Sequence, residues 1–74
     1  MSRLIRMDRS GHTTLAEWTE ADADSVEAAV KAFRAELELG MLAVVSKPDG
    51  TAEQVRELPL GAELVIMRRP LAGG

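Results

Sequence analysis

Cysteine is absent from the 74-residue sequence, and histidine occurs once. Without cysteine the chain has no disulfide, no thiolate metal ligand and no cysteine nucleophile, which fits a reducing compartment. A single histidine cannot form a histidine cluster for zinc. We therefore expect a cytoplasmic protein without a metal or cofactor, and not a metalloenzyme.

Long apolar runs are also missing. None approaches the roughly 20 residues that span a bilayer, and no charged start followed by an apolar stretch indicates a signal peptide. The formal net charge of −3 argues mildly against non-specific binding to nucleic acid. The aromatic residues are Trp18 and Phe33, which we expect in the core, so no exposed pair remains to stack on bases. The partners expected are proteins, with no membrane and no nucleic acid, and the chain itself is expected to be a monomer.

The composition is that of an ordinary globular protein, with 46% hydrophobic and 28% charged residues. A chain of this length buries only about 60% of the surface that its unfolded form exposes. It therefore makes one small domain at most. We place that domain at residues 1–70 and expect residues 71–74 to form a flexible C-terminal tail.

Hydrophobic periodicity predicts a hairpin, a helix, a second hairpin and a final strand. Turn residues separate these elements, with glycine at Gly11 and the run Pro48-Asp49-Gly50. Arg69-Pro70 ends the last strand, because proline has no N–H group for the ladder. The predicted strands are 3–7, 12–18, 41–46, 51–58 and 63–68, and the predicted helix is 25–39.

The helix carries the clearest pattern. Asp24, followed three residues later by Glu27, predicts a reciprocal N-terminal cap, and Gly40 predicts a left-handed C-terminal stop. The helix also carries acidic side chains, Glu36 among them, so we expect the charge of the molecule to be unevenly distributed. One apolar stripe is formed by Val26, Ala29, Val30, Phe33 and Leu37.

A sheet curled over this single helix is the simplest way to bury the stripe, which gives an α+β fold. The final strand is apolar on both sides, with Leu64 and Ile66 on one and Val65 and Met67 on the other. Such a strand usually lies at the centre of a sheet. The first and last strands are expected to pair in parallel there, with the helix in a right-handed crossover. Met41 and Met67 are expected to fill the core.

Element order and two segments together resemble a known family. The chain resembles the ubiquitin-like β-grasp proteins in its element order: a hairpin with glycine in its turn (residues 10–18), then a helix, then further strands. It also resembles them in its last residues, Ala72-Gly73-Gly74. That family includes ubiquitin and the ThiS and MoaD type of sulfur carrier. The chain departs from ubiquitin in its plainer second hairpin at residues 47–50, and its lysines are Lys31 and Lys47 alone.

The resemblance implies a protein modifier or sulfur carrier that has no catalytic residue of its own. A separate activating enzyme would adenylate the C-terminal carboxylate of Gly74 and pass it to a thiol or to sulfur. Glycine at 73 and 74 suits a narrow enzyme channel, because it lacks Cβ and takes nearly any backbone conformation. Leu71 and Ala72 would contact the enzyme, and Arg68 and Arg69 would pair with its acidic groups.

Charge placement gives a weaker hypothesis. If the first and last strands are parallel neighbours, the arginines at 3, 6 and 9 and at 68 and 69 gather on one side near the tail, where Arg6 would help to bind an acidic protein partner. His12 beside the first turn is expected to be exposed and without a role. Two alternatives stay open: a non-catalytic interaction module with a merely mobile tail, and a small accessory protein.

Overall fold

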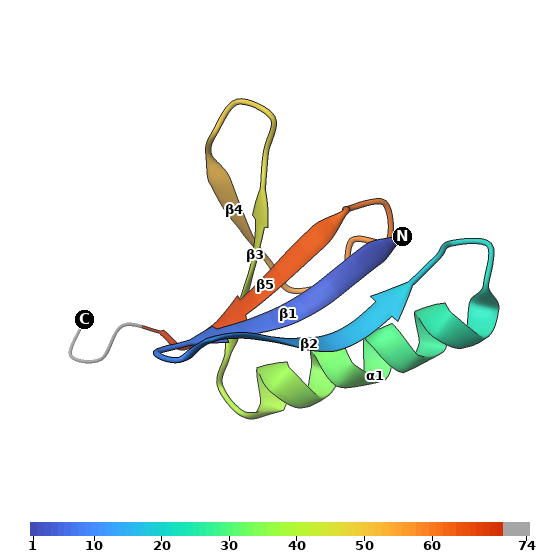
Figure 1. The fold of residues 1–74 in the computed structure, drawn as a ribbon, viewed down its shortest axis with the longest axis horizontal. Coiled ribbons are helices and arrows are strands. Elements are labelled where there is room, and N and C mark those ends of the chain that lie inside the picture. The colour runs from blue at the N-terminus through green and yellow to red at the C-terminus, as the bar shows by residue number, and fades with distance from the viewer. Residues whose placement is uncertain (71–74) are drawn as a thin grey trace.

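A computed structural model describes residues 1–70. It is a small α+β domain with the β-grasp layout, in which one five-stranded sheet packs on one helix (Figure 1). The strand order is β2-β1-β5-β3-β4, so the first and last strands are neighbours. The elements are β1 (Ser2–Asp8), β2 (Gly11–Trp18), α1 (Ala23–Glu38), β3 (Leu42–Ser46), β4 (Ala52–Val55) and β5 (Leu64–Arg68).

The first hairpin closes at the predicted turn. The Oδ1 atom of Asp8 accepts hydrogen bonds from the backbone N–H of Ser10 (2.9 Å) and from its Oγ (2.7 Å). Gly11 follows with φ of +127°, a conformation that residues with Cβ rarely adopt. A register shift beside Leu4 and Ile5 leaves Leu15 without a partner on β1.

The helix begins two residues before the predicted start, and the predicted cap at Asp24 is wrong. Asp22 is the N-cap: its Oδ1 accepts from the backbone N–H groups of Asp24 (3.1 Å) and Ser25 (3.3 Å). An N-cap carboxylate accepts hydrogen bonds from the backbone N–H groups two and three positions after it. Counted from Asp22, these are the N–H groups of Asp24 and Ser25, so Asp22 is the residue that caps the helix. The predicted stop is confirmed, because Gly40 has φ of +88°.

The core lies between the sheet and α1, and Trp18 and Phe33 are its largest buried side chains. Met41 and Met67 fill it as expected. Trp18 satisfies its indole N–H by donating to the carbonyl oxygen of Leu60 at 3.0 Å, which ties the loop before β5 to the end of β2. The remaining buried cluster consists of Leu4, Ala29, Ala43 and Val65.

The second hairpin is shorter than predicted on its returning side. β4 ends at Val55 and not at residue 58, because the chain bends after Val55 and carries Leu58 back against the core. β4 is an outer strand and pairs only with β3. Figure 1 shows this hairpin projecting from one side of the sheet, away from α1.

The predicted parallel pairing of β1 and β5 is confirmed, with Ile5 opposite Ile66. Alternate residues of these strands face the helix, whereas Ile5, Ile66 and the adjoining Val44 of β3 share the side of the sheet that α1 leaves uncovered. Because the two strands run the same way, the β1–β2 turn and Pro70 lie at the same end of the domain.

Candidate functional site

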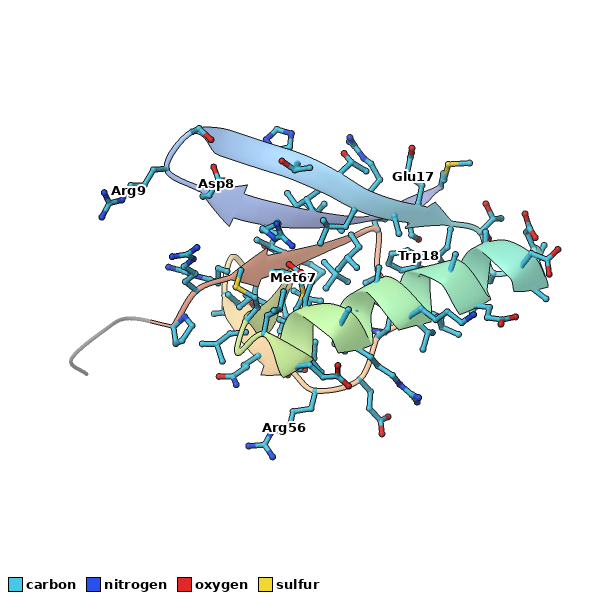
Figure 2. The ribbon with its side chains drawn as sticks, turned by 90° about the horizontal axis from the view of Figure 1, so that it is seen from below. Asp8, Arg9, Glu17, Trp18, Arg56 and Met67 are labelled. Carbon is cyan, nitrogen blue, oxygen red and sulfur yellow. The ribbon has the colours of Figure 1, made fainter. Side chains whose placement is uncertain are left out.

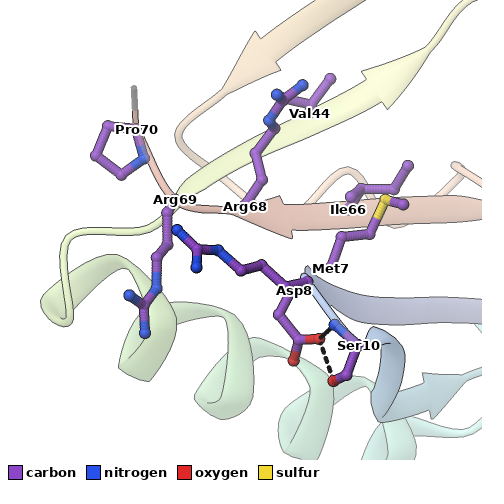
Figure 3. A pocket seen from close by; sticks show the side chains of 9 residues that line it. Met7, Asp8, Ser10, Val44, Ile66, Arg68, Arg69 and Pro70 are labelled. Atoms are coloured by element: carbon purple, nitrogen blue, oxygen red, sulfur yellow. Dashed lines mark hydrogen bonds between the residues drawn. The ribbon is translucent and has the colours of Figure 1, made fainter. Parts of the chain in front are cut away.

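The end of β5 borders a groove on the uncovered side of the sheet (Figure 3). The groove has a volume of about 1050 Å³. Three separate segments supply its walls: the end of β1 with the following turn, the middle of β3, and the end of β5. Its lining residues are Met7, Asp8, Arg9, Ser10, Val44, Ile66, Arg68, Arg69 and Pro70.

The floor of the groove is apolar. Val44 and Ile66 are paired neighbours on β3 and β5, and both are half-buried. Met7 stands beside them with 47% of its surface exposed. A methionine side chain is flexible and polarizable, so it adapts to differently shaped apolar partners.

The rim is basic. Arg9 comes from the β1–β2 turn, and Arg68 and Arg69 come from the end of β5. Within residues 1–70, the ion pairs formed are Arg6–Glu36, Lys31–Glu27 and Lys47–Glu53, so none of the three rim arginines has a carboxylate partner there. As far as the described residues go, their guanidinium groups are not held by an internal carboxylate.

Asp8 is the acidic residue of the lining, and the turn already uses its carboxylate. The hydrogen bonds from the Ser10 hydroxyl and backbone N–H lower the pKa of Asp8 below its ordinary value. The carboxylate is thus ionised at neutral pH. Three arginines still outnumber it, which leaves the groove with a positive balance.

Arg6 faces the helix side of the sheet, where it forms an ion pair with Glu36 of α1. Its Nε and Nη2 atoms donate to the two Glu36 carboxylate oxygens at 2.6 and 2.5 Å. These hydrogen bonds, and then the charge of Glu36, raise the pKa of Arg6. Glu36 is only 3% exposed, so this acidic side chain of the helix lies in the interior. The pairing lets a carboxylate remain in the interior.

A second, smaller hollow lies on the helix side of the same end and has a volume of about 520 Å³. Arg69 and Pro70 line both hollows, so the chain leaves β5 between them. Leu39, at the end of α1, is 71% exposed at this hollow. The other lining residues are Arg6, Gly40 and Met41.

Other kinds of site are not found in the described part of the chain. No group of three or more His, Cys, Asp or Glu side chains among residues 1–70 is arranged to hold a metal ion. No helix described there is long and apolar enough to cross a membrane. His12 is exposed on β2.

The predicted site residues divide into three groups. Arg68 and Arg69 line the groove together with Arg9, as the charge argument expected. Arg6 borders the helix-side hollow and is held by Glu36, and Arg3 pairs with Leu64 at the start of β5, away from this end. The predicted partner-binding residues Leu71 and Ala72 and the predicted reactive residues Gly73 and Gly74 lie outside the described residues.

The groove floor was not predicted. Met7 and Ile66 were placed on strands, but the sequence pattern did not say which face of each strand the helix covers. The signal was available in the final strand, whose apolar residues on both sides require either a second covering layer or an exposed apolar face. The Arg6–Glu36 pair had no comparable signal, since 30 residues separate its members.

The comparisons with known proteins give no match: no family, no curated protein and no solved structure is recognisably similar to this chain.

Proposed function

We propose that this protein is a ubiquitin-like modifier or sulfur carrier of the cytoplasm, which reacts through the carboxylate of Gly74 after a separate enzyme has activated it. The observation that carries the proposal is the position of Pro70. It follows Arg69, the first residue after the central strand β5, and is exposed at one end of the domain, between two hollows. Whatever follows Pro70 is joined to the central strand of the sheet.

Activation of the Gly74 carboxylate requires a tail that is joined firmly to the folded domain. The Gly74 carboxylate would attack the α-phosphate of ATP and release pyrophosphate, and a thiol or sulfide would then displace AMP. Both steps take place on the activating enzyme, which must hold the domain while the carboxylate reaches its active site. Arg68 and Arg69 have no ion-pair partner among residues 1–70, and they suit acidic groups on that enzyme.

The test begins with the intact mass of the protein isolated from its native host. The proposal requires Gly74 to carry a free carboxylate, a thiocarboxylate that is heavier by the exchange of one oxygen for sulfur, or a bond to a target protein. A protein found only with additional residues after Gly74, or never modified under any growth condition, contradicts the proposal.

A pair of variants tests the role of the diglycine. Gly74→Ala should abolish thiocarboxylate and conjugate formation, because the added Cβ obstructs close backbone approach. Gly61→Ala is the matched control: a Cβ there would meet only Glu20 Oε1, at an ordinary 3.7 Å. Normal activity of Gly74→Ala would favour the alternative, an interaction module that works without tail chemistry.

A further inference from the structure

We propose that the bond between Asp49 and Gly50 is a site of spontaneous modification, where the backbone converts through a cyclic imide to isoaspartate. The site lies in the turn of the β3–β4 hairpin, whose residues 47–51 are all exposed. The linings of the two hollows beside Pro70 contain none of these residues. Modification here is therefore independent of the chemistry of Gly74 and goes beyond it.

The reaction joins two neighbouring groups of the chain. The Gly50 backbone nitrogen bonds to the side-chain carboxyl carbon of Asp49 and gives up its proton, and a carboxyl oxygen leaves as water. Water then attacks the main-chain carbonyl carbon of Asp49 and breaks its bond to nitrogen. The main chain afterwards runs through Cβ and Cγ of residue 49. Because one water is released and one is taken up, the product has the same mass and no other reactant is consumed.

The sequence offers this reaction one favourable place. Asp49 is the aspartate that glycine follows, and the others precede residues that carry a Cβ: Asp8, Asp22 and Asp24. Glycine has no Cβ to hinder the attack of its nitrogen. Gly50 has φ of +87°, and a Cβ built there would meet nothing within 4 Å. The water that the second step requires therefore has free access to the turn.

The closed turn restrains both reacting groups. The Gly50 backbone N–H is occupied, because it donates to the carbonyl oxygen of Lys47 at 3.0 Å. Asp49 Oδ1 accepts from the backbone N–H of Thr51 at 3.0 Å and from its Oγ1 at 2.6 Å. These hydrogen bonds lower the pKa of Asp49, so its carboxylate is ionised at neutral pH and its carbon is a poor electrophile. The turn must open before the reaction can proceed.

Opening of this turn is favoured by its place in the fold. β4 has four residues and is an outer strand that pairs with β3. The hairpin projects from one side of the sheet, away from α1 (Figure 1). Segments that make few contacts open locally more often than central strands do. The conversion should therefore proceed from a small open population, at a rate that the hydrogen bonds of the turn determine.

The product does not fit the closed turn. The backbone N–H of Lys47 donates to the carbonyl oxygen of Thr51 at 2.8 Å, and isoaspartate inserts an additional carbon into the main chain between them. The converted hairpin should therefore loosen, whereas β1 and β5 stay paired. The product also exposes a free α-carboxylate. This group is a substrate for a carboxyl methyltransferase, which would move the methyl group of S-adenosylmethionine to a carboxylate oxygen and release S-adenosylhomocysteine.

The experiment incubates the purified protein at neutral pH and withdraws samples over time. Each sample is treated with an isoaspartate-specific carboxyl methyltransferase and labelled S-adenosylmethionine, and peptide fragmentation locates the modified residue. We expect isoaspartate to accumulate at residue 49. Its absence there after prolonged incubation would overturn the proposal.

The first hairpin provides an internal control. Asp8 lies in its turn (Figure 2), and its Oδ1 accepts from the backbone N–H and the hydroxyl of Ser10 as Asp49 Oδ1 does from Thr51. The residue after Asp8 is Arg9, whose Cβ hinders the attack. Residue 8 should therefore stay unmodified in the same samples. Equal conversion at residues 8 and 49 would refute the role of Gly50.

Variants separate the glycine from the restraint. Gly50→Ala should lose nearly all of the conversion. Thr51→Ala removes one hydrogen bond to the carboxylate and should raise the rate about fivefold. Thr51→Ser keeps a hydroxyl and is the matched control, with a rate within about twofold of the unmodified protein. Circular dichroism checks that each variant is folded. Unchanged conversion in Gly50→Ala, or equal rates in Thr51→Ala and Thr51→Ser, would contradict the proposal.

Two further measurements complete the test. The full chain unfolded in guanidinium chloride lacks the restraint and should convert faster than the folded protein, and an equal rate would refute the restraint. The converted protein, isolated by chromatography, should exchange the amides of β4 faster and those of β1 at the same rate. Gly74→Ala should convert normally at residue 49 even if it has lost all tail chemistry, so the two proposals can fail independently.

Discussion

The carboxylate of Asp22 holds the first turn of α1 through the backbone N–H groups of Asp24 and Ser25. Replacing it with alanine leaves both donors to water and should lower the free energy of unfolding by about 1 kcal/mol. Asp24→Ala is the control, because in the described residues its carboxylate accepts no backbone hydrogen bond of this turn. It should cost only a few tenths of a kcal/mol, through the helix dipole. Urea denaturation of the two variants measures the difference, and a larger loss in Asp24→Ala would contradict the assignment of the cap.

A second residue-scale prediction concerns pH. Asp8 and Asp49 each accept two hydrogen bonds from the residue two positions onward, and both have a lowered pKa. A lowered folded pKa means that the contribution to stability is present above the unfolded value, about 3.9, and is lost as the pH falls through the folded pKa. Both turns should therefore loosen only in acid.

Ser10→Ala tests the cause of this shift. It removes one of the two donors to Asp8, so the carboxyl ¹³C titration of Asp8 should move up toward the ordinary value. Asp49 keeps both hydrogen bonds from Thr51 and should titrate unchanged in the same sample. An unmoved Asp8 midpoint would show that the hydroxyl does not cause the shift.

At the scale of elements, the Arg6–Glu36 pair ties β1 to the last turns of α1. Arg6→Met should destabilise the domain markedly, because Glu36 is 3% exposed and would be left buried without a partner. Glu36→Leu should cost much less, since the Arg6 side chain is 39% exposed and can be hydrated. In thermal denaturation, Arg6→Met should have a lower midpoint temperature than both Glu36→Leu and the unmodified protein.

The double variant Arg6→Met/Glu36→Leu completes the cycle. It replaces the ion pair by apolar contact and should recover most of the stability lost in Arg6→Met. If the loss of unfolding free energy in the double variant equals the sum of the losses in the two single variants, Arg6 and Glu36 do not stabilise each other, and the proposed tie between β1 and α1 is wrong.

Most elements could be predicted from the sequence because their signals are local. The turn at Gly11, the stop at Gly40 and the apolar stripe around Phe33 each depend on residues a few positions apart. The Arg6–Glu36 pair and the groove depend on which strands become neighbours and on which face the helix covers. The parallel pairing of β1 with β5 was predicted, but it brings only some of the arginines together, because alternate residues point to opposite sides of the sheet. Arg6 and Arg9 are only three positions apart in the sequence, but Arg6 lies on the helix side of the sheet and Arg9 borders the groove on the other side.

At the scale of the whole molecule, the groove lies over the strands with the most neighbours. β1, β5 and β3 each pair on both sides, whereas β2 and β4 are outer strands. Local opening is cheapest where few contacts cross, so native-state hydrogen exchange should be slowest in β1, β5 and β3. The amides of β4 and of the turn at residues 47–51 should exchange fastest among the described elements, since β4 is short and its first three residues are exposed.

This prediction bears on function as well as on stability. Met7, Val44 and Ile66 come from the three inner strands, so a slow-exchanging floor would present a fixed apolar surface to a partner. Repeating the exchange at a second pH checks that the rates report opening equilibria. If the amides of β4 are protected from exchange as strongly as those of β5, the sheet opens as one unit. The prediction that the groove floor is more rigid than the β3–β4 hairpin would then be wrong.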